Sequence, residues 1–388
     1  MDLARGLETL LVAATIAALA PMVVALLPGP RIPQVVVLLA GGVLVGPEVL
    51  GWGDRATIDL LANVGLGFLF LLAGYELDPR LFRERPGRLA IVAWLVTVAI
   101  AAATVGALAA AGFVRAFVPV ALGLTTTALG TLLPILRDND MLGGRFGRYL
   151  LAAGAVGELF PVVAIALFLG ARNQFVALAS LAAVGVLAAA LSFAPRLVRG
   201  NRLERILREG EGATGQTYVR WTVALLLLLL LTAEEFGLDV VLGAFLAGIV
   251  LRRWSPGDVH VLEGKLDAIG YGFFIPLFFV ASGMTLDIRS IAETPLRLVA
   301  FFALLLVVRG VPALFLYRRD LPPAQRVQTM FLTATALPLL VALAEIGLRN
   351  GTMLRENAAA LVGAGALSVL VFPMVAVLIQ RRTTRSSA

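Results

Sequence analysis

A succession of long apolar segments, separated by short polar loops, constrains this chain more than any other feature of its sequence. Many of these segments have about 20 residues, the length that a helix needs to cross the hydrocarbon core of a bilayer. They are too long and too uniformly apolar for the strands of a membrane barrel. We therefore expect an all-α polytopic membrane protein with about 13 transmembrane helices, over residues 7–27, 32–50, 57–76, 87–113, 117–136, 146–170, 175–195, 218–236, 238–251, 267–286, 296–317, 324–347 and 357–380.

Composition narrows the possible functions. The chain is 60% hydrophobic and has no cysteine, which excludes disulfides, thiol chemistry and cysteine metal sites. Its single histidine, His260, cannot form a histidine metal cluster and lies in the polar stretch 254–265. There is no nucleotide fingerprint, P-loop or metal motif. We therefore expect neither an enzyme nor a protein with a bound cofactor.

The basic residues predict the orientation in the membrane. Most of the 32 basic residues follow the odd-numbered apolar segments. Positively charged loops stay on the cytoplasmic side, so the N-terminus is expected outside and the C-terminus in the cytoplasm, in a bacterial inner membrane. The same rule explains the net charge of +7 without a nucleic-acid partner. Residues 196–217, which are polar and rich in arginine, are expected to form a cytoplasmic linker.

The chain also repeats itself with inverted orientation. The second and ninth apolar segments share glycine-rich sequence at 38–46 and 242–250. The third and tenth, at 65–78 and 270–287, each open with Gly-X-Gly-Phe and close with Leu-Asp. An odd number of crossings separates the two copies, so they traverse the membrane in opposite directions. Inverted repeats of this kind are typical of secondary transporters.

Two corresponding segments contain both threonines and prolines. The fifth has Thr125, Thr126 and Thr127 followed by Pro134; the twelfth has Thr333 and Thr335 followed by Pro338. Each proline leaves the carbonyl four residues earlier without its helical partner. Polar residues and helix breakers in paired segments predict two crossed discontinuous helices around a binding site at mid-membrane. The alternative is that the threonines only bond to their own helices.

Glu158 is the single acidic residue of the segment from 146 to 170 and lies near its middle. A carboxylate at that depth is costly and is usually functional. Pro161 frees the carbonyl of Gly157, so a titratable oxygen and a freed carbonyl are adjacent. This pair of oxygens suits a proton or a cation. A fixed ion pair is the structural alternative.

Arg309 lies inside the eleventh segment and must face the protein interior. Glu158 is its expected charge partner. Glu345 and Glu76 lie nearer the ends of their segments and are secondary candidates for the site. Asn63, in the third segment, is another secondary candidate or an inter-helix hydrogen bond.

The chain resembles the CPA2 branch of the monovalent cation/proton antiporters, in the sodium/proton exchanger superfamily. The resemblance covers essentially the whole chain and rests on Leu39-Ala40-Gly41 with Gly46-Pro47, Ala73-Gly74-Tyr75-Glu76-Leu77-Asp78, Leu242-Gly243-Ala244-Phe245-Leu246-Ala247-Gly248 and Phe274-Ile275-Pro276-Leu277-Phe278-Phe279-Val280. It implies thirteen helices, a homodimer and elevator-type alternating access. By that resemblance a core formed by 87–170 and 294–380 moves against a dimer or scaffold part formed by 1–86 and 218–290.

The sequence departs from the family pattern at three places. The usual Asp-Asp or Asn-Asp pair is Gly157-Glu158, so that only the second, ion-carrying acid is present. Arg309 matches a basic residue that is often lysine. The Arg-Gly-Glu often found in the twelfth segment is absent around 336–338.

The expected function is exchange of Na⁺ or K⁺ for H⁺ across the membrane. The ion site would consist of Glu158, Gly157, Thr126, Thr127, Thr333 and Thr335. Because one carboxyl carries either one proton or one monovalent cation, and Arg309 keeps its proton, exchange is expected to be electroneutral. Two alternatives stay open: a transporter of the same fold that carries an organic anion bound by Arg309, and an uncoupled channel-like or sensing protein.

Overall fold

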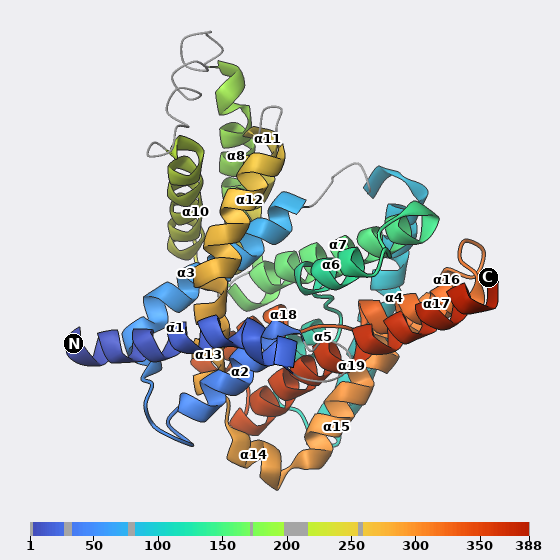
Figure 1. Cartoon of the computed structure of the whole chain (residues 1–388). Helices are drawn as coiled ribbons and strands as arrows, with labels where there is room; N and C mark the ends of the chain where they lie inside the picture. The colour runs from blue at the N-terminus through green and yellow to red at the C-terminus, as the bar shows by residue number, and fades with distance from the viewer. Residues whose placement is uncertain are drawn as a thin grey trace. The chain divides into compact units, whose positions relative to one another are not determined.

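The computed structural model describes residues 3–26, 33–76, 82–170, 174–197, 216–254 and 259–387. Over these residues the chain is helical and contains no strand (Figure 1). The expected linker 196–217 falls mostly outside the described residues, as do Leu77 and Asp78 of the third-segment motif. The all-α fold class is confirmed.

Nine helical segments in the described part of the chain are long and apolar enough to cross a membrane. Shorter apolar helices cover Gln34–Val45 and Leu178–Phe193. The chain is thus a multi-pass membrane protein. Each of the expected segments is helical over most of its described length, while the count of thirteen crossings stays a prediction.

The chain divides into two compact units. The first consists of Met1–Ala17, Arg55–Leu77 and Ile165–Ala281, and the second of Ala18–Asp54, Asp78–Ala164 and Ser282–Ala388. Three helices contribute to both units: α1 (Leu3–Leu26), α7 (Gly144–Ile165) and α13 (Ile275–Met284).

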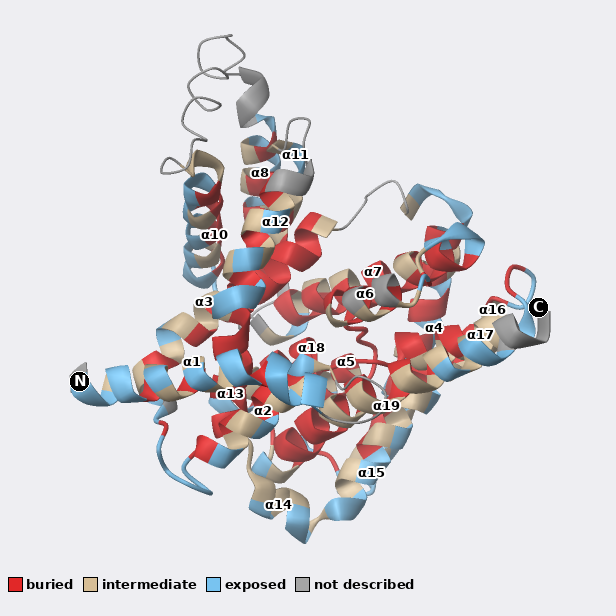
Figure 2. Cartoon of the chain, viewed as in Figure 1, coloured by how far each residue is buried: buried red, intermediate tan, exposed pale blue. Residues whose placement is uncertain are grey.

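In the first unit, α11 (Val240–Trp254) packs against α3 (Arg55–Glu76), α10 (Thr217–Glu235) and α8 (Gln174–Leu197). Most residues of α11 are buried (Figure 2). Gly74 lies directly against the backbone of Phe245, where a Cβ would overlap. Glycine therefore permits the close approach of α3 and α11. The unit continues in α12 (Val259–Ile269) and the π-helical η3 (Gly270–Phe274).

In the second unit, α2 (Gln34–Val45) meets the end of α13 through an equivalent contact. Gly283 lies against the backbone of Leu39, and here too a Cβ would overlap. Gly283 stands at the same place in its repeat as Gly74 does, since each lies four residues before a Leu-Asp aspartate. A glycine of each repeat thus lies against the backbone of a helix from the other repeat, which agrees with the inverted-repeat prediction.

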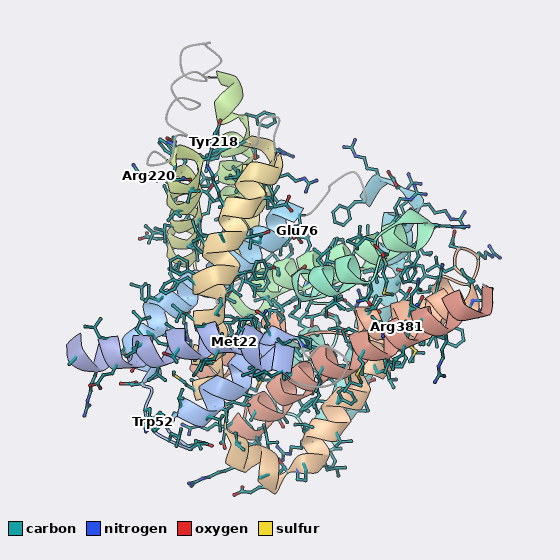
Figure 3. All side chains as sticks on the ribbon, in the orientation of Figure 1. Met22, Trp52, Glu76, Tyr218, Arg220 and Arg381 are labelled. Carbon is teal, nitrogen blue, oxygen red and sulfur yellow. The ribbon has the colours of Figure 1, made fainter. Side chains whose placement is uncertain are left out.

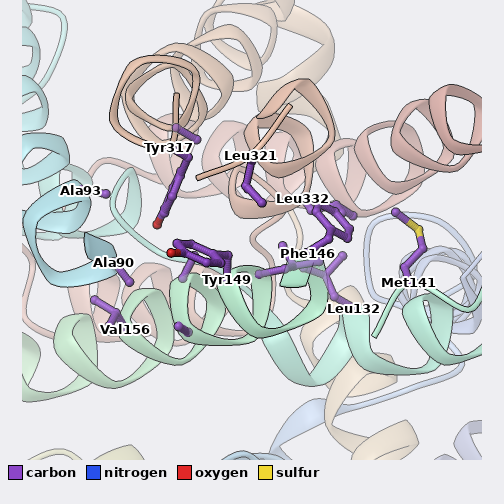
Figure 4. Packing of buried hydrophobic residues seen from close by; sticks show 14 of the residues in the cluster. Ala90, Ala93, Leu132, Met141, Phe146, Tyr149, Val156, Tyr317, Leu321 and Leu332 are labelled. Atoms are coloured by element: carbon purple, nitrogen blue, oxygen red, sulfur yellow. The ribbon is translucent and has the colours of Figure 1, made fainter. Parts of the chain in front are cut away.

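The second unit also contains a buried apolar cluster around Tyr149 and Tyr317 (Figure 4), whose rings meet edge to face at 5.9 Å. The cluster joins α4 (Arg85–Ala110), α7 and α16 (Val311–Leu316) to α17 (Pro323–Thr333). The remaining helices of this unit are α5 (Phe117–Gly123), α6 (Leu129–Asp138), α14 (Ile288–Glu293), α15 (Pro295–Leu304), η4 (Leu305–Gly310), α18 (Pro338–Arg349) and α19 (Arg355–Ser387).

Asp320 ties the ends of these helices together. Its carboxylate accepts hydrogen bonds from the Tyr149 hydroxyl at 2.8 Å and from Arg145, and Arg85 Nε lies 2.9 Å away. Burial raises the pKa of Asp320, but the hydrogen bonds from Tyr149 and Arg85 outweigh it and hold the pKa below its ordinary value. The loop between α16 and α17 is thereby attached to the first turns of α4 and α7.

Candidate functional site

Two helices are interrupted, as the sequence predicted. The fifth segment consists of α5 and α6 with a break at residues 124–128, and the twelfth of α17 and α18 with a break at 334–337. Pro338 is the first residue of α18, and the residue before a proline is pushed out of the helical region. Pro134, in contrast, lies within α6 and not at the break. The first break coincides with Thr125 and Thr126, whose hydroxyls bond to carbonyls three residues earlier.

The two breaks bond to each other. The backbone N–H of Ala128 donates to the carbonyl of Thr335 at 2.8 Å, and the Thr127 hydroxyl donates to the carbonyl of Thr333 at 2.6 Å. Helix ends inside a membrane need partners for their free backbone groups. Each interrupted helix supplies partners for the other.

Ser368, on α19, supplies a hydrogen-bond partner to the backbone of the second break. Its hydroxyl accepts a hydrogen bond from the N–H of Ala336 at 3.0 Å and lies 2.9 Å from the carbonyl of the same residue. Sequence analysis missed this residue. A serine inside the otherwise apolar last segment was the available signal.

The place where the two breaks bond to each other is called the crossing below. Helix α7 bonds to this crossing at the residue before Glu158. The N–H of Thr127 donates to the carbonyl of Gly157 at 2.9 Å. This carbonyl is the one that Pro161 frees, so the predicted free acceptor binds the backbone of the first break. Glu158, the next residue, is buried, with 7% of its surface exposed. The structure therefore places an acidic side chain of low exposure on the helix that touches the crossing.

Arg309 also reaches the crossing from its place in η4. It is 3% exposed; Nε donates to the Thr127 hydroxyl at 3.0 Å and Nη2 to the carbonyl of Ala153 at 2.9 Å. The π-helical turn ends where Val311 N–H bonds to the carbonyl of Leu306, just before Pro312. Such turns frequently occur at functional sites. The pairing of Arg309 with Glu158 stays a prediction.

Gly157 has a steric role in this arrangement. A Cβ at this position would overlap Arg309 Nη2 and would lie 2.5 Å from Thr127 Oγ1. The guanidinium and the threonine hydroxyl therefore occupy the space that a larger side chain at position 157 would need.

The hydroxyls of the other predicted threonines bond to carbonyls of the helix that contains or precedes them. The hydroxyls of Thr126, Thr333 and Thr335 are each hydrogen-bonded to carbonyls three or four residues earlier. All three are buried. Their hydroxyl oxygens keep lone pairs that can bind a cation. Of the four threonines predicted for the site, Thr127 alone has side-chain hydrogen bonds to other helices.

The secondary candidates divide between the two units. Asn63 forms a long hydrogen bond to Asp59 on its own helix α3, at 3.5 Å, so the inter-helix bond expected for it is replaced by a contact one turn away. Glu76 is half-buried at the last residue of α3 (Figure 3). Asn63 and Glu76 belong to the first unit, and Glu158 to the second. Glu345, on α18, lines a cavity of the second unit.

The family described as "Sodium/hydrogen exchanger, transmembrane" matches residues 12–379. The chain belongs to the sodium/hydrogen exchanger family. This membership confirms the resemblance found in the sequence, and it places the chain in a family of membrane transporters.

Individual relatives agree with this family. The chain is 28% identical over 362 residues to the glutathione-regulated potassium-efflux system protein KefC of Klebsiella pneumoniae, covering 90% of this chain and 57% of KefC. It is 27% identical over 292 residues to cation/H(+) antiporter 18 of Arabidopsis thaliana, covering 67% of this chain and 35% of the relative. Across curated relatives such as these, the chain spans between 34% and 67% of the relative's length.

The fold is also that of a solved exchanger. The structure of the sodium proton antiporter MjNhaP1 from Methanocaldococcus jannaschii at pH 8 aligns with a TM-score of 0.66 and 15% identity, over 98% of this chain and 97% of that one. This likeness establishes the exchanger fold.

Proposed function

We propose that the chain exchanges a monovalent cation, Na⁺ or K⁺, for H⁺, with Glu158 as the shared carrier. The observation that carries the proposal is a buried Glu158 on α7, whose Gly157 carbonyl bonds to the first of two interrupted helices that bond to each other. A protonated carboxyl cannot bind a cation, and an ionised carboxylate can, so the two ligands exclude each other. The oxygens of Thr126, Thr127, Thr333 and Thr335 would complete the cation's shell, since hard cations bind oxygen.

Arg309 serves as a fixed positive charge in this proposal. Its bonds to Thr127 and Ala153 orient the guanidinium, and arginine does not lose its proton in proteins. The site then has the same net charge with a proton as with a monovalent cation, and exchange is electroneutral. Thr127 and Ala153 occupy two of its five N–H donors, which leaves fewer of them for an organic anion.

The larger arrangement is part of the same proposal. The protein lies in a bacterial inner membrane with its N-terminus outside and its C-terminus in the cytoplasm, as a homodimer. Residues 87–170 and 294–380 form the moving core, and residues 1–86 and 218–290 form the scaffold of an elevator. The division into compact units supports this in part, because 294–380 falls within the second unit and 218–281 within the first.

A gradient assay in proteoliposomes tests the function. An imposed Na⁺ or K⁺ gradient should drive proton movement with wild-type protein, and Glu158→Gln should abolish it while the protein still folds. Glu293→Gln changes an exposed glutamate of α14 and is the matched control. Exchange that survives in Glu158→Gln contradicts the carrier assignment. Movement of an organic anion, or cation flux without proton movement, supports the alternative functions instead.

A further inference from the structure

Ser368 lies in α19 with its side chain fully buried against the second break. Its Oγ accepts a hydrogen bond from the N–H of Ala336 at 3.0 Å, and lies 2.9 Å from the carbonyl of Ala336 and 2.7 Å from that of Gly365. Because a hydroxyl has one proton, it donates to one of these carbonyls at a time. One side chain of α19 therefore bonds to the backbone of an interrupted helix.

Gly365 makes room for this contact. It lies one helical turn before Ser368, on the same face of α19. A Cβ at position 365 would lie 2.8 Å from the carbonyl oxygen of Ala336 and 2.9 Å from Leu340 Cδ1, closer than packed atoms allow. The second break is thus held against α19 by a missing side chain at one position and a hydroxyl at the next turn.

Helix α7 holds the first break in a corresponding way. Helices α7 and α19 contain the sixth and thirteenth apolar segments, which are seven apart like the other paired segments. The N–H of Thr127 donates to the carbonyl of Gly157 on α7, and the N–H of Ala336 donates to Ser368 on α19. In each repeat, the break therefore donates a backbone N–H to the helix that follows it. Ser368 has in the second repeat the role that Gly157, the neighbour of Glu158, has in the first.

The position of the second break affects the first break directly. Thr335, the residue before Ala336, accepts the N–H of Ala128 at 2.8 Å. The carbonyl of Thr333 accepts the hydroxyl of Thr127 at 2.6 Å. Backbone groups without partners are costly inside a membrane, so a second break that loses its bond to α19 would shift to find another partner. Such a shift would move the two carbonyls that hold the first break.

We infer that Ser368 is a positioning residue for ion exchange, which fixes the site around Glu158 through the crossing. Thr127 is the link, because it bonds to both Arg309 and Gly157. The effect on transport rests on the proposed function. Without the Ser368 hydroxyl, the carboxyl and the threonine oxygens of the site remain, but they are less well aligned. Cation affinity should therefore fall more than the maximal rate of exchange.

Exchange in proteoliposomes over a range of cation concentrations tests this inference. Ser368→Ala should raise the KM for Na⁺ or K⁺ roughly fivefold, as expected for the loss of one buried hydrogen bond. Ser368→Thr keeps the hydroxyl and should have a lower KM than Ser368→Ala. Gly365→Ala, which displaces the carbonyl of Ala336, should raise KM although the hydroxyl is present. Ser192→Ala is the matched control, because its buried hydroxyl bonds to its own helix, α8.

Hydrogen–deuterium exchange of the purified full chain gives a readout that does not depend on transport. Ser368 has no direct bond to the first break, so a local role would leave residues 124–128 unchanged. We expect the amides of Thr127 and Ala128 to exchange roughly fivefold faster in Ser368→Ala. Helices α10 and α11, in the other compact unit, should exchange as in the wild type.

Three results would overturn the inference. An unchanged KM in both Ser368→Ala and Gly365→Ala would show that the second break does not affect the ion site. A KM as high in Ser368→Thr as in Ser368→Ala would show that the hydrogen bond is not the cause. Faster amide exchange confined to the second break would show that the effect is not transmitted. If the wild type fails to exchange cations while the amides of the first break respond, the proposed function is contradicted and the positioning role is not.

Discussion

Gly157 shows how one residue determines the arrangement of several others. Its backbone carbonyl accepts the N–H of Thr127, and its missing side chain leaves room for Arg309 and the Thr127 hydroxyl. A side chain at this position and a guanidinium at Arg309 cannot both occupy that space. The glycine and the arginine should therefore be considered together in any account of the site.

Gly157→Ala tests this steric argument. The new Cβ would overlap Arg309 Nη2, so we expect the folded state to lose about 1–3 kcal/mol, as in other overpacked cores, and exchange to fall. The control is Gly130→Ala on α6, where an added Cβ meets nothing within 4 Å. Thermal unfolding in detergent measures both variants. Equal melting temperatures for the two would contradict the proposed crowding.

Sequence reasoning at the residue scale identified Glu158, Arg309 and Thr127 because charged and polar groups are conspicuous in apolar segments. It could not predict that the carbonyl freed by Pro161 binds the Thr127 N–H, since that bond depends on how α7 meets the first break. It also missed Ser368. A single serine is common in membrane helices, and only the packing, which brings the Ser368 hydroxyl to the backbone of Ala336, gives it a role.

At the scale of elements, the interrupted helices were predictable and their exact breaks were not. Pro338 marks the start of α18, whereas Pro134 lies inside α6, and the first break is set by threonine hydroxyls that bond to α5. The contacts by which Asp320 connects helices could not be predicted from the sequence, because its partners Arg85, Arg145 and Tyr149 are far away in the chain.

Asp320→Asn tests this attachment of the loop to α4 and α7. The pKa of Asp320 lies below its ordinary value of 3.8 in the folded state, so ionisation of the carboxylate stabilises the folded chain above that pH. The contribution disappears as the pH falls below about 4, through the folded-state pKa. Because Arg85 and Arg145 are largely exposed, most of the effect comes from the Tyr149 hydrogen bond.

We therefore expect Asp320→Asn to lower the melting temperature at pH 7, and its difference from the wild type to shrink as the pH falls from about 4 towards 3. Asp140→Asn, which removes an exposed carboxylate after α6, is the control at both pH values. A difference between wild type and Asp320→Asn that is as large at pH 3 as at pH 7 would show that charge is not the cause.

At the scale of the whole molecule, the inverted repeat is visible in two equivalent contacts, Gly74 with Phe245 and Gly283 with Leu39. The repeat and the all-helical fold could be read from the sequence, because glycine patterns and apolar length are local properties. The count of crossings depends on short helices such as Gln34–Val45, whose length alone does not decide whether they span.

Cysteine labelling tests the orientation. The chain has no native cysteine, so Arg83→Cys and Arg115→Cys each provide a unique target. The distribution of basic residues predicts that a membrane-impermeant reagent applied outside labels position 115 and not position 83. Labelling of position 83 alone from outside would invert the topology.

The central claim is that Glu158 binds either a proton or a cation. The most direct measurement is proton release from purified protein in weakly buffered solution when saturating Na⁺ or K⁺ is added. At a pH at which the Glu158 carboxyl is protonated, the account predicts release of up to one proton per chain from the wild type and none from Glu158→Gln. Cation binding by the wild type without proton release, or the same release from Glu158→Gln, would contradict it.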